Sequence, residues 1–175
     1  MRSVVVYESM FGNTHAVAEA IATGLRRTGD VVIVPVEQAT KDVLEGADLV
    51  VVGGPTHAHG MSSAQSRKGA PDYVEKSHGD LTLEDGWDGM GLRDWFQELP
   101  DHPCAGAAFD TRADMAAFLS GRASKGIADR LTKHGCRLVA EPESFLVSKD
   151  SHLLPHELDR AAEWGASLAA AFVTH

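Results

Sequence analysis

Residues 4–21 read VVVYESMFGNTHAVAEAI: an apolar strand, a short loop with hydroxyl groups and one glycine, and then an amphipathic helix. From Val17 to Leu25 apolar residues recur at helical spacing, so the helix begins directly at the loop. The first backbone N–H groups of a helix have no partner inside it, and the helix dipole favours an anion there. Ser9 and Thr14 add two hydroxyl groups. We therefore predict that residues 9–14 form a phosphate loop.

The details of this loop exclude two common phosphate sites. A nucleoside triphosphatase loop carries Gly-Lys-Ser/Thr after four spacer residues, and a dinucleotide-binding turn carries three glycines. Residues 4–22 contain neither pattern and no Lys or Arg. Neutral donors alone would hold the anion, which suits a single terminal phosphate.

The spacing of Tyr7, Ser9, Gly12 and Thr14 after two apolar residues, with Ala18 and Ile21 following, resembles the flavodoxin signature. In that family this loop holds the phosphate of FMN. The resemblance implies that FMN is the cofactor and that its phosphate is bound by Ser9, Met10, Phe11, Gly12, Asn13 and Thr14. The alternative is a strand-to-helix turn that uses Gly and Ser only for its own geometry.

The order of elements predicts an α/β fold, because strands alternate with helices along the chain. We expect a doubly wound, three-layer fold with a five-stranded parallel sheet in the flavodoxin-like order 2-1-3-4-5. After the first strand, the predicted strands cover residues 31–34, 48–54 and 104–109. A fifth strand covers 137–140 and 144–147 and is interrupted or bent at Glu141-Pro142 between them. The predicted helices follow the loop and then cover residues 40–45, 92–99, about 123–131 and 155–172.

The loops after the third and fourth strands lie beside the phosphate loop in such a fold. In flavodoxins they enclose the isoalloxazine ring, usually with a Trp and a Tyr, and this chain has neither residue there. The resemblance assigns ring contacts to Pro55, Thr56, His57, Ala58, His59 and Gly60, and to Phe109, Asp110, Thr111 and Arg112.

Two of these assignments have alternatives. Arg112 either faces the N1 and O2 region of the flavin, where negative charge accumulates on reduction, or forms a surface ion pair with Asp110 or Asp114. His57 and His59 are too few ligands for a metal site, so we predict flavin stacking or simple exposure.

Residues 61–91 form a polar stretch that is longer than an ordinary connection. They begin beside the predicted ring site, so Gln65, Ser66, Arg67 and Lys68 could cover the flavin or receive a partner or an anionic substrate. The alternative is a disordered surface insertion. Trp87 could bring an aromatic ring to the site, whereas we expect Trp95 in a helix core.

Length and composition indicate one domain. A chain of 175 residues with 43% apolar and 23% charged residues is typical of an ordinary globular protein. It has no apolar run of about 20 residues and no signal-peptide pattern at its start. We expect a single cytoplasmic domain, residues 1–175, that does not bind membranes.

The formal charge of −9 argues against nucleic acid as a ligand. An acidic electron carrier could use this charge to steer towards a redox partner protein with a basic docking face. The alternative is that the charge only keeps the protein in solution.

Cys104 and Cys136 are the only cysteines, which excludes a zinc site or a disulfide framework. They open the predicted fourth and fifth strands, which would be parallel neighbours. Buried free thiols and a redox disulfide both remain open.

We therefore predict a flavodoxin-like protein that binds FMN and transfers electrons through it, rather than a substrate-specific oxidoreductase. One alternative is a small flavin-dependent reductase with a small-molecule acceptor of the quinone type. The other is a binding or regulatory protein that uses this fold without flavin. No residue is assigned a covalent catalytic role or a metal.

Overall fold

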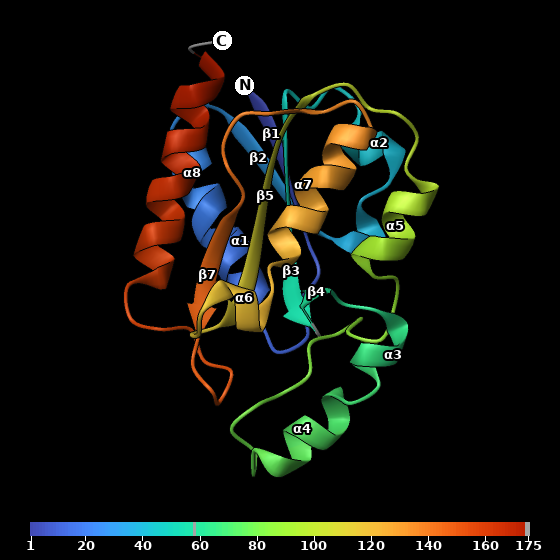
Figure 1. Ribbon diagram of the computed structural model, residues 1–175. Coiled ribbons are helices and arrows are strands. Elements are labelled where there is room, and N and C mark those ends of the chain that lie inside the picture. The colour runs from blue at the N-terminus through green and yellow to red at the C-terminus, as the bar shows by residue number, and fades with distance from the viewer. Residues whose placement is uncertain (58, 174–175) are drawn as a thin grey trace.

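A computed structural model describes residues 1–57 and 59–173. Figure 1 shows a central sheet with helices on both faces, and its parallel strands follow the order β2-β1-β3-β5-β6. The predicted α/β fold and strand order are confirmed. The main strands are β1 (Arg2–Tyr7), β2 (Asp30–Pro35), β3 (Leu49–His57), β5 (Ala105–Ala113), β6 (Arg137–Leu138) and β7 (Glu143–Val147).

Two segments, β6 and β7, occupy the fifth position of the sheet, which agrees with the predicted interruption at Pro142. β6 pairs with β5 at Ala105 and Gly106, and β7 pairs with the same edge of β5 from Phe109 to Ala113. Pro142 lies between the two segments.

Two helical layers cover the sheet. One face carries α1 (Asn13–Leu25) and α8 (Glu157–Val173), and the other carries α2 (Lys41–Leu44), α5 (Leu92–Glu98) and α7 (Ala123–Lys133). Alternate β1 side chains enter opposite cores: Val4 and Val6 face α2, α5 and α7, whereas Val5 faces α1 and α8. The continuous apolar runs of the strands thus reflect burial on both faces.

A pair of glycines allows α1 and α8 to pack closely. A Cβ at Gly24 would lie 2.1 Å from the carbonyl oxygen of Ala162, and one at Gly165 would lie 2.2 Å from that of Ile21. Any larger residue at either position would force the two helix backbones apart.

The segment at 61–91 is folded onto the end of the sheet rather than left without structure. It contains α3 (Ala64–Arg67) and α4 (Ala70–Lys76), which extend beyond the sheet at the lower right of Figure 1. The remaining short elements are the 3-10 helix η1 (Val36–Gln38), β4 (Gly60–Met61) and α6 (Ala117–Ser120).

The predicted strands 48–54 and 104–109 are too short. β3 continues to His57 because β4 pairs with its end in an antiparallel hairpin, and β5 continues to Ala113 because β7 pairs with it throughout. These strand ends are the segments that were expected to be ring loops, so their side chains alternate between faces. Among the described residues, no helix is long and apolar enough to span a membrane.

Candidate functional site

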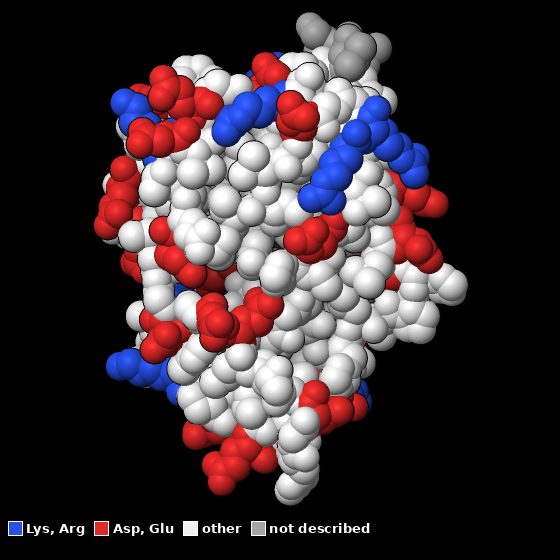
Figure 2. Space-filling model, turned by 180° about the vertical axis from the view of Figure 1, so that it is seen from behind, with Lys and Arg blue, Asp and Glu red and all other residues white. Residues whose placement is uncertain are grey.

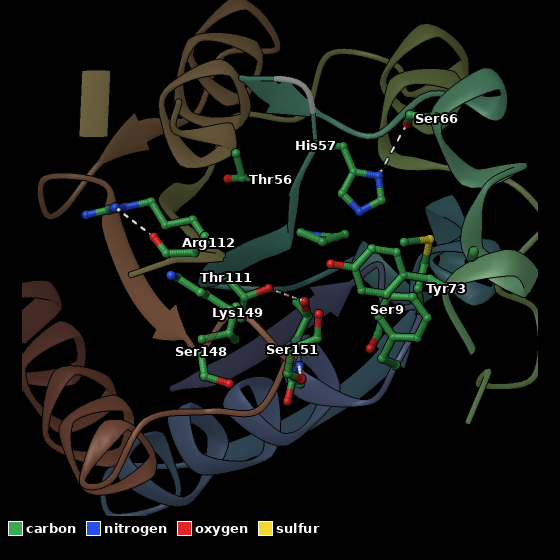
Figure 3. A pocket seen from close by; sticks show the side chains of 18 of the residues that line it. Ser9, Thr56, His57, Ser66, Tyr73, Thr111, Arg112, Ser148, Lys149 and Ser151 are labelled. Carbon is green, nitrogen blue, oxygen red and sulfur yellow. Dashed lines mark hydrogen bonds between the residues drawn. The ribbon is translucent and has the colours of Figure 1, made fainter. Parts of the chain in front are cut away.

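A cavity of about 730 Å³ opens at the carboxyl ends of the strands. Its volume lies within the range of about 300–1,000 Å³ that is usual for ligand sites. The described residues that line it come from the phosphate loop, the ends of β3 and β5, the segment of α3 and α4, and the loop after β7 (Figure 3). The predicted site residues among them are Ser9, Met10, Phe11, Asn13, Thr14, Pro55, Thr56, His57, Thr111 and Arg112.

The predicted phosphate loop, residues 9–14, leads directly into α1. Gly12 is the N-cap of α1 with φ 90°, a left-handed conformation that favours glycine. The first hydrogen bond of the helix is donated by the Ala16 N–H to the Gly12 carbonyl, so the N–H groups of Asn13, Thr14 and His15 lie before the helical ladder. Gly12 itself lies outside the cavity lining, and its N–H donates to Ser9 Oγ at 3.2 Å.

Two side chains of this loop form hydrogen bonds with residues far away in the sequence. The hydroxyl oxygens of Thr14 and Thr111 are 2.8 Å apart, and both residues are at least 95% buried. The Asn13 Nδ2 donates to the carbonyl of Ser151 in the loop after β7. The phosphate loop is therefore held against β5 and the last loop of the sheet.

The cavity carries two cationic side chains. Arg112 lines it from β5, and Lys149 lines it from the loop after β7, as Figure 3 shows. The expectation that neutral donors alone surround the anion site holds for residues 4–22 but not for the cavity. The fold brings Lys149 in because the carboxyl ends of parallel strands meet at one edge.

Arg112 is held by its own loop. Its Nη1 donates to the Met115 carbonyl at 2.7 Å and to Ser120 Oγ at 3.2 Å. In the described part of the chain it forms no ion pair with Asp110 or Asp114, so the surface salt bridge considered as an alternative is not formed. Its Nε is buried and has no hydrogen-bond partner among the described residues.

Phe109 and Asp110 point away from the cavity. The Phe109 ring is fully buried and packs against Gly53, where an added Cβ would lie 2.1 Å from the ring. Asp110 is also fully buried, and its Oδ2 accepts a hydrogen bond from the Ser124 N–H at 2.7 Å, in the first turn of α7. Both carry structural roles because each lies under a helical layer, Phe109 in the core with α1 and α8 and Asp110 at the start of α7, whereas the part of β5 that lines the cavity begins at Thr111.

The other predicted ring contacts differ among themselves. His57 lines the cavity with its Nδ1 3.3 Å from Ser66 Oγ. Burial lowers the pKa of His57 below 6.5, and the nearby positive charge of Arg67 lowers it further. His59 is exposed with φ 73°, and neither it nor Gly60 belongs to the lining made by the described residues. Ala58 lies outside the described residues.

Tyr73 was missed by the sequence analysis. It lies on α4, lines the cavity and is 51% exposed, with its ring centroid 6.0 Å from that of Phe11. Figure 3 shows the rings of Tyr73 and His57 both directed into the cavity. The segment of α3 and α4 thus supplies an aromatic ring where the loops have neither Trp nor Tyr. We call its lining residues, Ser66, Gly69, Ala70 and Tyr73, the insertion wall.

A buried ion pair fixes the insertion wall to the sheet. Arg67 and Glu8 are 4% and 6% exposed, and Arg67 Nη1 lies 3.7 Å from Glu8 Oε1. Ser62 Oγ contacts both side chains, and Glu8 Oε2 accepts a hydrogen bond from the Leu92 N–H at 2.8 Å. Arg67 was considered for covering the flavin or for receiving a partner or an anionic substrate, but it is instead an internal anchor. Its neighbours Gln65 and Lys68 are exposed and do not belong to the lining formed by the described residues.

The two tryptophans considered for the site lie elsewhere. Trp95 lies on α5 and is buried in the core, which confirms its expected role. Its Nε1 donates to the Ala39 carbonyl at 2.7 Å. Trp87 borders a separate hollow of about 290 Å³. No group of three or more His, Cys, Asp or Glu in residues 1–57 and 59–173 could hold a metal ion.

Comparison with known proteins bears on the family and the fold of the chain. Residues 4–81, which include the phosphate loop, match the family model of the flavodoxin domain. The chain is flavodoxin-like. A flavodoxin from the domain Archaea superposes with a TM-score of 0.66 at 21% identity, with 100% of each chain covered.

Other solved structures share this flavodoxin-like fold. Oxidised flavodoxin 1 from Bacillus cereus superposes with a TM-score of 0.64 at 20% identity, covering 100% of this chain and 99% of that one. A flavodoxin, WrbA-like protein from Agrobacterium tumefaciens has a TM-score of 0.59 at 20% identity, covering 99% and 98% of the two chains. No curated protein matches the chain at a significant level. At these identities the structural likeness establishes the fold.

Proposed function

We propose that this flavodoxin-like chain binds FMN in the cavity and passes electrons through the flavin. The observation that carries the proposal is the predicted phosphate loop, whose helix-start amides precede the helical ladder and whose Asn13 and Thr14 line a cavity of about 730 Å³. The unpartnered Nε of Arg112 fits a ligand with acceptor atoms. Asn13 and Thr14 would hold the phosphate, and His57, Tyr73 and Arg112 would border the ring.

Bound FMN would supply the electron-transfer chemistry, and the side chains would position it and adjust its potential. Arg112 and Lys149 place positive charge at the cavity, which favours the more negatively charged, reduced form of a ligand there. Burial keeps His57 neutral near pH 7, because its pKa is lowered from 6.5.

A redox partner would approach beside the cavity mouth. Met115, Phe118 and Leu119, in and before α6, are 46%, 83% and 54% exposed, and Met115 also lines the cavity. Carboxylates predominate over Lys and Arg on the face seen in Figure 2, in line with the charge of −9. The exposed apolar residues support an apolar contact with the partner, and the charge of −9 supports a partner with a basic docking face.

The direct test is titration of the flavin-free apoprotein with FMN and, separately, with riboflavin, followed by flavin fluorescence. We expect one FMN to bind per chain and riboflavin to bind more weakly, because only FMN uses the phosphate loop. If neither flavin binds, the proposal fails and the flavin-free binding protein is favoured. Equal affinities for the two flavins would refute the phosphate role of residues 9–14.

A small reductase with a quinone-type acceptor is the second candidate. It is supported by the exposed ring of Tyr73 at the cavity, where a planar acceptor could stack.

Stopped-flow oxidation of the reduced holoprotein by a quinone and by a basic redox protein separates the two functions. In the electron carrier, a double variant Phe118→Ser and Leu119→Ser slows only the protein acceptor; slowing of neither reaction contradicts the α6 docking site.

A further inference from the structure

The two cysteines lie side by side at the end of the sheet that is opposite the cavity. Cys104 immediately precedes β5 and Cys136 immediately precedes β6, and these strands pair in parallel from Ala105 and Arg137. The Arg137 N–H donates to the Cys104 carbonyl at 2.8 Å. Neighbouring strands are about 4.7–4.9 Å apart, and disulfides join Cα atoms that are about 4.4–6.8 Å apart. The backbone therefore already has the spacing of a disulfide.

The side chains are directed at one another. The two Sγ atoms are 2.6 Å apart, and the Cys136 Sγ is also 3.3 Å from the carbonyl oxygen of His102. Cys136 follows Gly135, whose φ of 89° turns the chain out of α7 and into β6. Cys136 is 5% exposed and Cys104 is half-buried, so the pair sits just below the surface.

We propose that Cys104 and Cys136 are a redox modification site that forms a reversible intramolecular disulfide. The site is independent of the flavin, since β5 starts at the cysteine pair and reaches the cavity only at Thr111 to Ala113. Its oxidant is a small molecule of the peroxide or disulfide class, which can reach the sulfurs near the surface.

The contact between the two thiols prepares the reaction. The hydrogen bond from Cys104 lowers the pKa of Cys136, and the same bond, together with burial, raises the pKa of Cys104. Cys136 is thus the thiol whose pKa favours the thiolate, and the overall balance is the same whichever sulfur attacks first.

With hydrogen peroxide, Cys136 sulfur breaks the O–O bond and becomes a sulfenic acid, and hydroxide leaves. Cys104 then loses its proton and attacks that sulfur, the S–O bond breaks, and water is released. Two thiols and one peroxide give one disulfide and two waters.

The disulfide would close the loop of residues 104–136, which contains β5, α6 and α7. A covalent link of this kind stabilises the fold mainly by restricting the unfolded chain. Oxidation should therefore raise the thermal unfolding midpoint, while the affinity for FMN stays unchanged because the link lies at the far end of β5.

The test treats the full chain with hydrogen peroxide and follows intact mass, alkylation of thiols and thermal unfolding, with or without later dithiothreitol. We expect the loss of two hydrogens, full protection from alkylation and a raised midpoint, all reversed by dithiothreitol. The variants Cys104→Ser and Cys136→Ser serve as controls, and neither should show the raised midpoint.

Three results would overturn the proposal: both thiols still alkylate after oxidation, the chain only gains oxygen atoms, or it forms disulfide-linked dimers. The flavin titration is a separate readout, so failure of flavin binding leaves this test intact.

Discussion

The phosphate loop and the insertion wall border the same cavity but depend on different kinds of contact. Within the loop, the Gly12 N–H bonds to Ser9 three residues earlier, and α1 begins at once. The insertion wall instead depends on Arg67, whose carboxylate partner Glu8 lies on another part of the chain. Short-range geometry therefore sets the start of the helix, and neutral hydrogen bonds from Thr14 and Asn13 hold the loop in place, whereas the wall depends on a long-range buried charge pair. Substitutions should separate the two.

The largest effect is expected from the anchor of the insertion wall. Arg67→Met leaves Glu8 buried at 6% exposure without its cation, so we expect a loss of about 3–5 kcal/mol in the free energy of unfolding. Chemical denaturation measures this loss, and the exposed neighbour Lys68→Met is the control. The double variant Glu8→Gln and Arg67→Met should recover part of the stability. Equal stability of Arg67→Met and the parent would show that the pair is not an anchor.

The phosphate loop should control affinity for FMN. Thr14→Val removes a buried hydroxyl at the start of α1 that lies 2.8 Å from the Thr111 hydroxyl. We expect FMN to bind about tenfold more weakly, from the loss of roughly 1–2 kcal/mol of hydrogen bonding, with little change for riboflavin. Thr23→Val, on the exposed side of the same helix, is the matched control. An equal loss for both flavins would mean that Thr14 acts on the fold and not on the phosphate.

A smaller effect on flavin affinity is expected at the insertion wall. Tyr73→Leu removes the ring that lies beside Phe11 and would border the flavin. An aromatic pair contributes about 0.5–1.5 kcal/mol, so the affinity for the flavin should fall by roughly 2- to 10-fold. FMN and riboflavin should be affected alike, because the ring contact does not involve the phosphate. Tyr73→Phe should bind like the parent. A loss confined to FMN would place Tyr73 at the phosphate instead.

The smallest effect is a dependence of stability on pH through His57. Its pKa is lowered from 6.5 in the folded chain, so below pH 6.5 the unfolded chain binds the proton more readily. Stability therefore falls as the pH drops through 6.5 towards the folded value. His57→Gln should reduce this fall in thermal unfolding between about pH 7.5 and about pH 5.5, and the exposed His59→Gln should not. An unchanged slope in His57→Gln would contradict the lowered pKa.

The sequence analysis was accurate where patterns are local. The helix begins directly after the loop, the apolar run of the third strand is buried, and the fifth strand is interrupted around Pro142, as the sequence predicted. The predicted ends of β3 and β5 were wrong, because the length of a strand depends on the strands that pair with it. β4 and β7 extend them, and the helices on the two faces of β5 bury Phe109 and Asp110.

Tyr73 and Lys149 could not be assigned to the site by spacing. Tyr73 reaches the cavity because the ion pair of Glu8 and Arg67 holds α3 and α4 over it. A buried ion pair between residues so far apart in the chain cannot be predicted from a local sequence pattern. Lys149 is exposed and follows a short strand, like many surface lysines. Only the meeting of strand ends at one edge of the sheet brings it to the cavity.

Residues 4–21 alone were enough to predict the strand, the phosphate loop and the helix start, because these depend on hydrogen bonds and side-chain periodicity within a few residues. The walls of the cavity and the meeting of Cys104 with Cys136 depend on the three-dimensional fold. They result from strand pairing and buried contacts between segments far apart in the chain, whose register is set when the whole sheet packs against its helices.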